Sequence, residues 1–172
     1  TTTVDLVLSD VVGDCLDVIA SGPLNPDKTT YADAIAVIDR YDLDVPAAVR
    51  ERLERGIDGM YPETPAADDP LFNRVTQYVV ADNQTALDAA AEVASDAGYD
   101  PLVMSTRIRG EAREAVKILT VIAEECAATG TPIDPPAVLL SGGETTVTIR
   151  GDGDGVGGPN QEFTLNTALD LV

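Results

Sequence analysis

The chain has 172 residues, of which 44% are hydrophobic, and it carries a formal net charge of −19. This length fits one domain or two small ones, and apolar runs that recur along the chain exclude a disordered protein. No apolar stretch approaches the roughly 20 residues that span a bilayer, and no secretory leader is visible, so no membrane association is expected. The strong negative charge disfavours a nucleic-acid partner, because acidic surfaces repel phosphate backbones.

Histidine is absent, which excludes several kinds of active site. Neither a Ser-His-Asp nor a Cys-His nucleophile system can form within the chain, and a His-ligated zinc site is excluded as well. The two cysteines, Cys15 and Cys126, are too few for a disulfide framework. A reducing, cytoplasmic location is therefore expected.

The acidic residues are dispersed along the chain rather than gathered in a tail. They number 30 against 11 basic residues, and only two of the basic residues are lysines, Lys28 and Lys117. At about 1 M salt the Debye length falls to about 3 Å, so the repulsion within such a surface is screened. The pattern favours a halophilic protein, and an ordinary acidic protein is the alternative.

The first part of the chain predicts one strand and two helices. A strand is expected at 3–9, and apolar spacing predicts helices at 31–41 and 46–55. Pro46 suits the first turn of the second helix and Gly56 its end. The proline-rich segment that follows predicts a linker at 61–72, so residues 1–60 are expected to belong to one α/β domain.

The remaining residues, 73–172, are expected to form a second α/β region. The predicted elements are strands at 75–81, 101–105, 137–141 and 145–149 and helices at 84–97, 111–129 and 161–171. Gly142 and Gly143 are expected to form a turn between the last two strands. Strands that alternate with helices indicate an α/β fold, a layered and largely parallel sheet with flanking helices.

The first candidate site is the loop after the first predicted strand. In open α/β sheets ligands bind beyond the carboxyl ends of the strands, where Ser9, Asp10 and Asp14 are placed. Two carboxylates across a glycine turn can hold Mg²⁺ or polarise a hydroxyl group, although a solvated turn is the alternative. Ser21 and Gly22 form a second turn with a hydroxyl group and backbone N–H groups.

A second candidate is the glycine-rich segment 151–158, which precedes a predicted helix. Its glycines would let the backbone approach a phosphate, and a helix N-terminus favours anions. Asp152 and Asp154, however, place negative charge where the pyrophosphate of a dinucleotide would lie. A flexible acidic loop is the alternative.

Two further segments combine polar residues with predicted element ends. The turn from Gly142 to Thr145 adds a carboxylate, Glu144, to the end of a buried strand, which suggests a docking site or a tight turn. Arg107 and Arg109 precede the long predicted helix and could meet phosphate, but surface ion pairing is the more common role in an acidic protein.

Four motifs together resemble one family. They are SDVVGD with SGP at 9–23, GEARE at 110–114, SGGETTVTIRG at 141–151 and GGPNQE at 157–162. In this order and spacing they are similar to the type-2 glycerate kinases. These proteins are often labelled hydroxypyruvate reductases, and their C-terminal region is called the MOFRL domain, which would begin at about residue 137 here.

The resemblance implies a two-domain kinase that uses ATP and Mg²⁺ to phosphorylate D-glycerate to 2-phosphoglycerate. Asp10 and Asp14 match the family's SDV-GD motif and are the candidate catalytic and metal-binding residues, because Asp10 or Asp14 is expected to orient Mg²⁺ or the glycerate hydroxyl group. The residues that the resemblance implies bind substrate or nucleotide are Ser9, Ser21, Gly22, Gly142, Gly143, Glu144, Thr145, Gly157, Gly158, Asn160 and Glu162. Pro159 stands where the family pattern has an arginine that stabilises phosphate, and Arg150 could replace that contact.

Members of this family are considerably longer, so the chain is expected to be a fragment of the family architecture. By itself the fragment is expected to have little or no kinase activity. An NAD(P)-dependent hydroxypyruvate reductase and a non-catalytic fragment are the alternatives. The expected ligands are glycerate and a nucleotide, and the sequence leaves the oligomeric state undecided.

Overall fold

The computed structural model describes residues 1–153 and 155–171, so Asp154 of the glycine-rich segment lies outside the described residues. The chain forms two compact units. Unit 1 comprises Thr1–Asp5 and Leu16–Tyr78, and unit 2 comprises Leu6–Cys15 and the chain from Val79 onward. None of the helices in the described ranges is long and apolar enough to cross a membrane.

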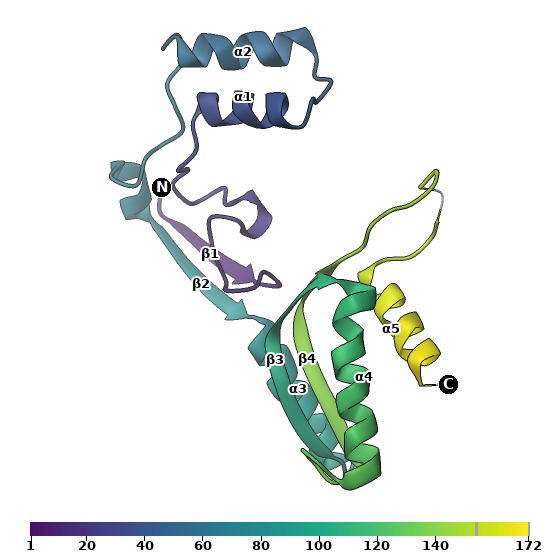
Figure 1. Cartoon of the computed structure of the whole chain (residues 1–172). Helices are drawn as coiled ribbons and strands as arrows, with labels where there is room; N and C mark the ends of the chain where they lie inside the picture. The colour runs from purple at the N-terminus through teal and green to yellow at the C-terminus, as the bar shows by residue number, and fades with distance from the viewer. Residues whose placement is uncertain (154, 172) are drawn as a thin grey trace. The chain divides into compact units, whose positions relative to one another are not determined.

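Unit 1 contains a pair of helices, α1 (Tyr31–Arg40) and α2 (Ala47–Ile57), which pack against each other (Figure 1). Thr30 and Asp33 form a complete capping box at the start of α1. Gly56 does not end α2, as the sequence suggested, but lies inside it. A Cβ at Gly56 would overlap the ring of Tyr31, so this glycine serves helix packing rather than helix termination.

Two short 3₁₀ helices complete unit 1: η1 (Ile19–Ser21) and η2 (Pro70–Arg74). They flank the helix pair in the sequence. Pro70 occupies the first turn of η2, and the side chain of Asp69 caps it by accepting a hydrogen bond from the backbone N–H of Leu71 at 2.8 Å. The segment after α2 is therefore irregular only until residue 69.

The strands β1 (Thr3–Leu8) and β2 (Val75–Ala81) pair with each other and contribute residues to both units. Gln77 Nε2 donates to Asp5 Oδ2 at 2.9 Å, and the Ser9 N–H donates to the Ala81 carbonyl at 2.9 Å. Because these partners advance together along both strands, the pairing is parallel (Figure 1).

Unit 2 is a parallel β-α-β arrangement with an additional helix at each end. Its elements are α3 (Asn83–Asp96), β3 (Asp100–Glu111), α4 (Ala112–Thr129), β4 (Ala137–Thr146) and α5 (Pro159–Asp170). Helices α3 and α4 cover opposite faces of the β3–β4 pair, and α5 packs against α4 (Figure 1). This confirms an α/β fold of parallel strands flanked by helices.

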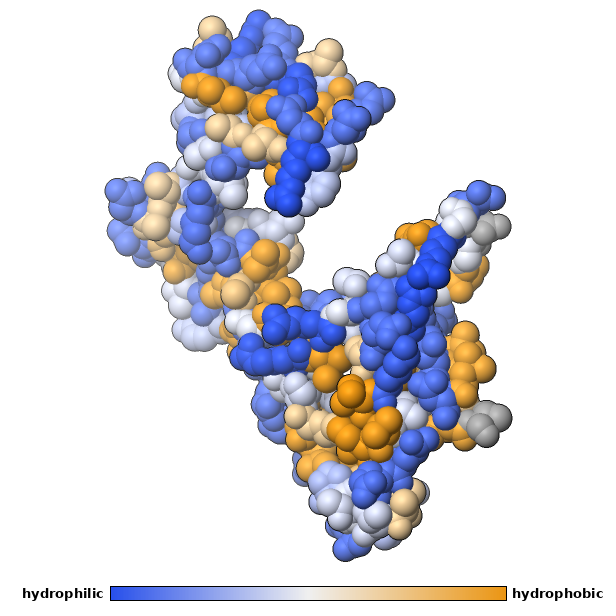
Figure 2. Space-filling model, viewed as in Figure 1, coloured by the Kyte–Doolittle hydropathy of each residue, from blue (hydrophilic) through white to orange (hydrophobic). Residues whose placement is uncertain are grey.

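The core of unit 2 lies beneath α4. Ala112 and Val116 are 0% and 1% exposed, and Cys126 is also buried on the same helix. These residues belong to the apolar face that the spacing of the sequence predicts. By contrast, Val4, Leu6 and Leu8 of β1 are exposed, and Figure 2 shows apolar surface interrupting the hydrophilic coat in both units.

Two sequence expectations about strands are wrong. The strand expected at 101–105 extends to Glu111, because β3 pairs with β4 as far as the Glu111–Thr146 register, with irregularities between Val103 and Ile108. The two strands expected at 137–141 and 145–149 are one strand, β4. Glycine favours turns, but here Gly143 stays in the ladder opposite Ile108.

Candidate functional site

The loop after β1 begins at the carboxyl end of the β1–β2 pair. Ser9 is buried and bonded to Ala81 through its backbone, and Asp10, which follows it, is exposed. Because the two strands are parallel, Asp10 and Asp82 both lie just beyond a strand end. An open cavity of about 240 Å³ is lined here by Leu8, Ser9, Asp10, Ala81 and Asp82.

Asp14 lies on a turn that reverses the chain after Asp10. The N–H of Asp14 donates to the carbonyl of Val11 at 3.1 Å, and Gly13 and Asp14 have φ angles of 94° and 54°. This left-handed conformation is easy for glycine and tolerable for aspartate, so the sequence Gly-Asp suits the turn. The Asp14 side chain is exposed, like that of Asp10.

Arg107 of β3 approaches this turn. A Cβ built on Gly13 would lie 3.7 Å from Nη1 of Arg107. Arg107 forms no ion pair with any residue in the described part of the chain, although the chain has 30 acidic residues. The surface ion pairing expected for Arg107 is therefore not observed among the described residues, and its charge lies beside the acidic loop.

Asn83 connects the acidic loop to β4. Its Nδ2 donates to the carbonyl of Asp10 at 3.4 Å, and a Cβ on Gly142 would lie 3.3 Å from its Oδ1. The structure thus brings Asp10 and Gly142 into one neighbourhood. Asn83 is a functional candidate that the motifs did not indicate, although it lies two residues beyond the end of β2, just as Asp10 lies two residues beyond the end of β1.

The segment Gly142–Thr145 contributes strand residues rather than a turn. Gly143 has a φ angle of 147°, and a Cβ there would overlap the backbone of Ile108, so only glycine fits. Glu144 is exposed opposite Arg109, and Thr145 is half-buried opposite Gly110. These residues extend the site along β4 away from Asp10.

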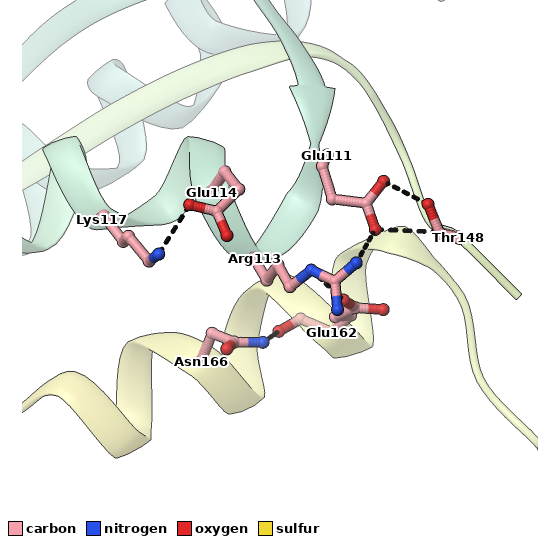
Figure 3. Close-up of polar contacts among 7 residues, drawn as sticks. All are labelled: Glu111, Arg113, Glu114, Lys117, Thr148, Glu162 and Asn166. Atoms are coloured by element: carbon pink, nitrogen blue, oxygen red, sulfur yellow. Dashed lines mark hydrogen bonds and ion pairs between the residues drawn. The ribbon is translucent and has the colours of Figure 1, made fainter. Parts of the chain in front are cut away.

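A polar network joins the end of β3 to the segment after β4 (Figure 3). Glu111 Oε1 accepts hydrogen bonds from Arg113 Nη2 at 2.7 Å and from the Thr148 N–H at 2.9 Å, and Oε2 accepts one from the Thr148 hydroxyl at 3.0 Å. These bonds favour the ionised form. They lower the pKa of Glu111, with the backbone bond from Thr148 as the largest cause.

The same network reaches the first turn of α5. Arg113 Nε lies 4.0 Å from Oε1 of Glu162, and both side chains are partly buried, at 28% and 30% exposed. Gly158 is the N-cap residue of α5, and Gly157 has a φ angle of 153°. Asn160 lies exposed in the first turn of the helix.

A second cavity, of about 600 Å³, lies between α5 and the segment after β4. Among the described residues its charged lining consists of Arg113, Arg150 and Glu162, and Gly157 and Gly158 form part of its wall. Apolar side chains, among them Ile149, Val156, Leu165 and Leu169, line the rest. Its volume lies within the range of about 300–1,000 Å³ that is usual for small-molecule sites.

The two neighbourhoods lie on one unit but are separate. From Gly142 to Thr146, four residues of β4 at roughly 3.3 Å per residue span about 13 Å.

Ser21 and Gly22 belong to unit 1, where Gly22 caps η1 and a Cβ on Gly22 would lie 2.5 Å from the Asp17 carbonyl. Within residues 1–153 and 155–171 no three His, Cys, Asp or Glu side chains cluster as a metal site.

Comparisons with known proteins match both ends of the chain to families. The model of the domain of unknown function DUF4147 matches residues 1–54, and that of the MOFRL family matches residues 137–172. The glycerate 2-kinase of Pyrococcus horikoshii is 44% identical over 96% of this chain and 37% of its own length. A putative hydroxypyruvate reductase of Agrobacterium vitis is 43% identical over 98% of this chain and 36% of its own length.

A solved structure agrees with these matches. The crystal structure of glycerate kinase from Thermotoga maritima superposes with a TM-score of 0.73 at 36% identity, covering 99% of this chain and 38% of that one. The chain is thus an α/β protein with the DUF4147 and MOFRL segments. It is similar to glycerate kinases along nearly its whole length and spans about 37% of the length of the P. horikoshii relative.

Proposed function

We propose that the chain forms part of a glycerate 2-kinase, which phosphorylates D-glycerate with ATP to give 2-phosphoglycerate and ADP. The observation that carries the proposal is the 44% identity to the P. horikoshii glycerate 2-kinase over 96% of the chain. Because the chain spans little more than a third of that protein, the proposal concerns the part of the site that this chain supplies.

In this proposal the acidic loop binds the acceptor and the cavity beside α5 binds the nucleotide, whose triphosphate extends along β4 so that the γ-phosphate reaches the acidic loop. Asp10 and Asp14 are exposed beyond a strand end, and Arg107, which forms no ion pair among the described residues, lies beside Gly13 of the same loop. A carboxylate can align a hydroxyl group and accept its proton, and a guanidinium can bind the carboxylate of glycerate. These are the groups that an acidic, hydroxylated substrate requires.

The reaction needs alignment more than covalent chemistry from the protein. The oxygen of the 2-hydroxyl group bonds to the γ-phosphorus, the bond from that phosphorus to the β,γ-bridging oxygen breaks, and the electron pair leaves on ADP. The hydroxyl proton passes to Asp10 or Asp14. Main-chain N–H groups at Gly157 and Gly158 and the charge of Arg150 would stabilise the phosphate oxygens.

The donor set fits Mg²⁺ as well as ATP. Mg²⁺ is usually held by one or two carboxylates together with water and substrate phosphates, and the loop supplies two carboxylates, Asp10 and Asp14. When bound, the ion would neutralise charge on the phosphate oxygens.

Direct binding tests the proposal against a hydroxypyruvate reductase, the name that the A. vitis relative bears. The 172-residue chain is titrated calorimetrically with ATP·Mg²⁺ and with NADH at about 3 M KCl, where its charges are screened. We expect heat of binding for ATP·Mg²⁺ and none for NADH. Binding of NADH alone would favour the reductase, and binding of neither would contradict a nucleotide site in this chain.

Activity assays then show how much of the machinery is present. ADP formation is followed with D-glycerate, and NADH oxidation with hydroxypyruvate. We expect little or no ADP formation from this chain, and none of the reductase reaction. We also infer a cytoplasmic location, supported by the free, exposed thiol of Cys15.

A further inference from the structure

The Glu111–Arg113–Glu162 network suggests a role that the motifs alone do not assign. We propose that Arg113 is a positioning residue that holds together the two walls of the 600 Å³ cavity, which are residues 147–150 after β4 and residues 155–162 at the start of α5. We further propose that this cavity receives the phosphates and the base of a nucleoside triphosphate. The second half of the proposal rests on the proposed function. The first half concerns the chain alone.

The geometry places Arg113 between the two walls. Through Glu111, which accepts hydrogen bonds from both Arg113 and Thr148, it holds the segment that leaves β4. Through Glu162 it holds the first turn of α5 (Figure 3). A single guanidinium can bind two carboxylates because it presents five donors in a rigid plane.

The burial of the network separates it from ordinary surface ion pairs. The side chains of Arg113 and Glu111 are 28% and 21% exposed, whereas those of Lys117 and Glu114, nearby on α4, are 55% and 60% exposed. Exposed pairs contribute little, because water and salt screen them. The hydrogen bonds from Thr148 to Glu111 add to the ion pair, so the network is more than a charge contact.

The chemistry of the cavity points to a nucleotide. Its described lining carries three charged side chains, those of Arg113, Arg150 and Glu162. Because Arg113 already pairs with Glu111 and Glu162, Arg150 supplies the charge available to a ligand. Ile149, Leu165 and Leu169 offer an apolar wall for a flat base.

The experiment compares Arg113→Gln and Arg113→Lys with a matched control, Lys117→Gln. The control removes an exposed ion pair of the same helix without touching the cavity. The readouts are the dissociation constant for ATP·Mg²⁺, that for D-glycerate, and amide hydrogen exchange at residues 147–150 and 155–162.

We expect Arg113→Gln to weaken ATP binding at least tenfold and to accelerate amide exchange on both walls, with D-glycerate binding unchanged. Arg113→Lys should be intermediate, because lysine keeps the charge but not the planar fork. Lys117→Gln should match the wild type. A merely structural role would weaken both ligands and the melting temperature together, without selectivity for ATP.

Distinct results overturn the two halves. Unchanged amide exchange on either wall in Arg113→Gln would overturn the positioning role, whatever the chain binds. If the wild-type chain binds no ATP, the nucleotide assignment and the proposed function both fail, while the exchange data still decide the positioning role. Should Arg113→Gln not fold, Thr148→Val removes one hydroxyl bond to Glu111, and unchanged exchange at 147–150 there would overturn the proposal.

Discussion

Replacing Gly143 by alanine should destabilise the chain strongly, whereas the same change at Gly142 should not. Gly143 has a φ angle of 147°, which L-residues rarely adopt, and its Cβ would overlap the Ile108 backbone. Such a conformation costs about 1–3 kcal/mol. Overpacking against a backbone that cannot rotate away costs about 1–3 kcal/mol more. The free energy of unfolding should therefore fall by about 2–6 kcal/mol.

Gly142 is the matched control. Its Cβ would lie 3.3 Å from Oδ1 of Asn83 and 3.4 Å from Cδ1 of Leu87, both side-chain atoms that can shift. The φ angle of Gly142 also lies outside the positive range that disfavours L-residues. We expect Gly142→Ala to cost less than about 1 kcal/mol.

Urea unfolding at about 3 M KCl, followed by far-ultraviolet circular dichroism, measures both variants. The slope with denaturant should stay constant if only stability changes. A Gly143→Ala variant as stable as the wild type, or a Gly142→Ala variant that loses more, would refute the continuous β4 strand and its close approach to β3.

Three further predictions concern charge. The melting temperature should rise between about 0.1 M and about 3 M KCl, because salt screens the repulsion within net charge −19, and a flat or falling curve would refute a halophilic adaptation. The pKa of Glu111 is below its ordinary value of 4.5, so the ionised side chain stabilises the fold above that pH, and this stabilisation is lost as the pH falls through the folded-state pKa. Glu111→Gln should flatten the dependence of the free energy of unfolding on pH in this range. A pH dependence identical to that of the wild type would contradict the network. Asp10→Asn and Asp14→Asn should each weaken the binding of ATP·Mg²⁺ or D-glycerate roughly ten- to a hundredfold, because a charge-assisted hydrogen bond is worth about 1.5–3 kcal/mol. Calorimetric titration measures both variants. Asp44→Asn, at an exposed position outside the proposed site, should have no effect.

The helices were largely predictable because their signals are local. The capping box of Thr30 and Asp33, the apolar face of α4 and the left-handed Gly130 that caps it all act within a few residues. Gly56 shows the limit of such signals. The same residue type suits a helix end and a close helix contact, and only the position of Tyr31 distinguishes the two.

The strands were harder to predict because their extent depends on partners far away in the sequence. Glu111 is a strand residue because Thr146 lies opposite it, and Gly143 stays in β4 because it fits against Ile108. The motifs identified Asp10, Asp14 and Glu162 as candidates. They could not show that Glu111 binds Thr148 after β4 or that Arg113 reaches Glu162 in the first turn of α5, because these contacts exist only in the fold.

The most direct test of the account is to locate ligand binding along the chain by nuclear magnetic resonance. Amide resonances of the 172-residue chain are compared without ligand, with ATP·Mg²⁺ and with D-glycerate. The account predicts that D-glycerate shifts the resonances of residues 9–14, and that ATP·Mg²⁺ shifts those of residues 147–150 and 157–162. Shifts confined to α1 and α2, or no shift with either ligand at saturating concentration, would contradict it.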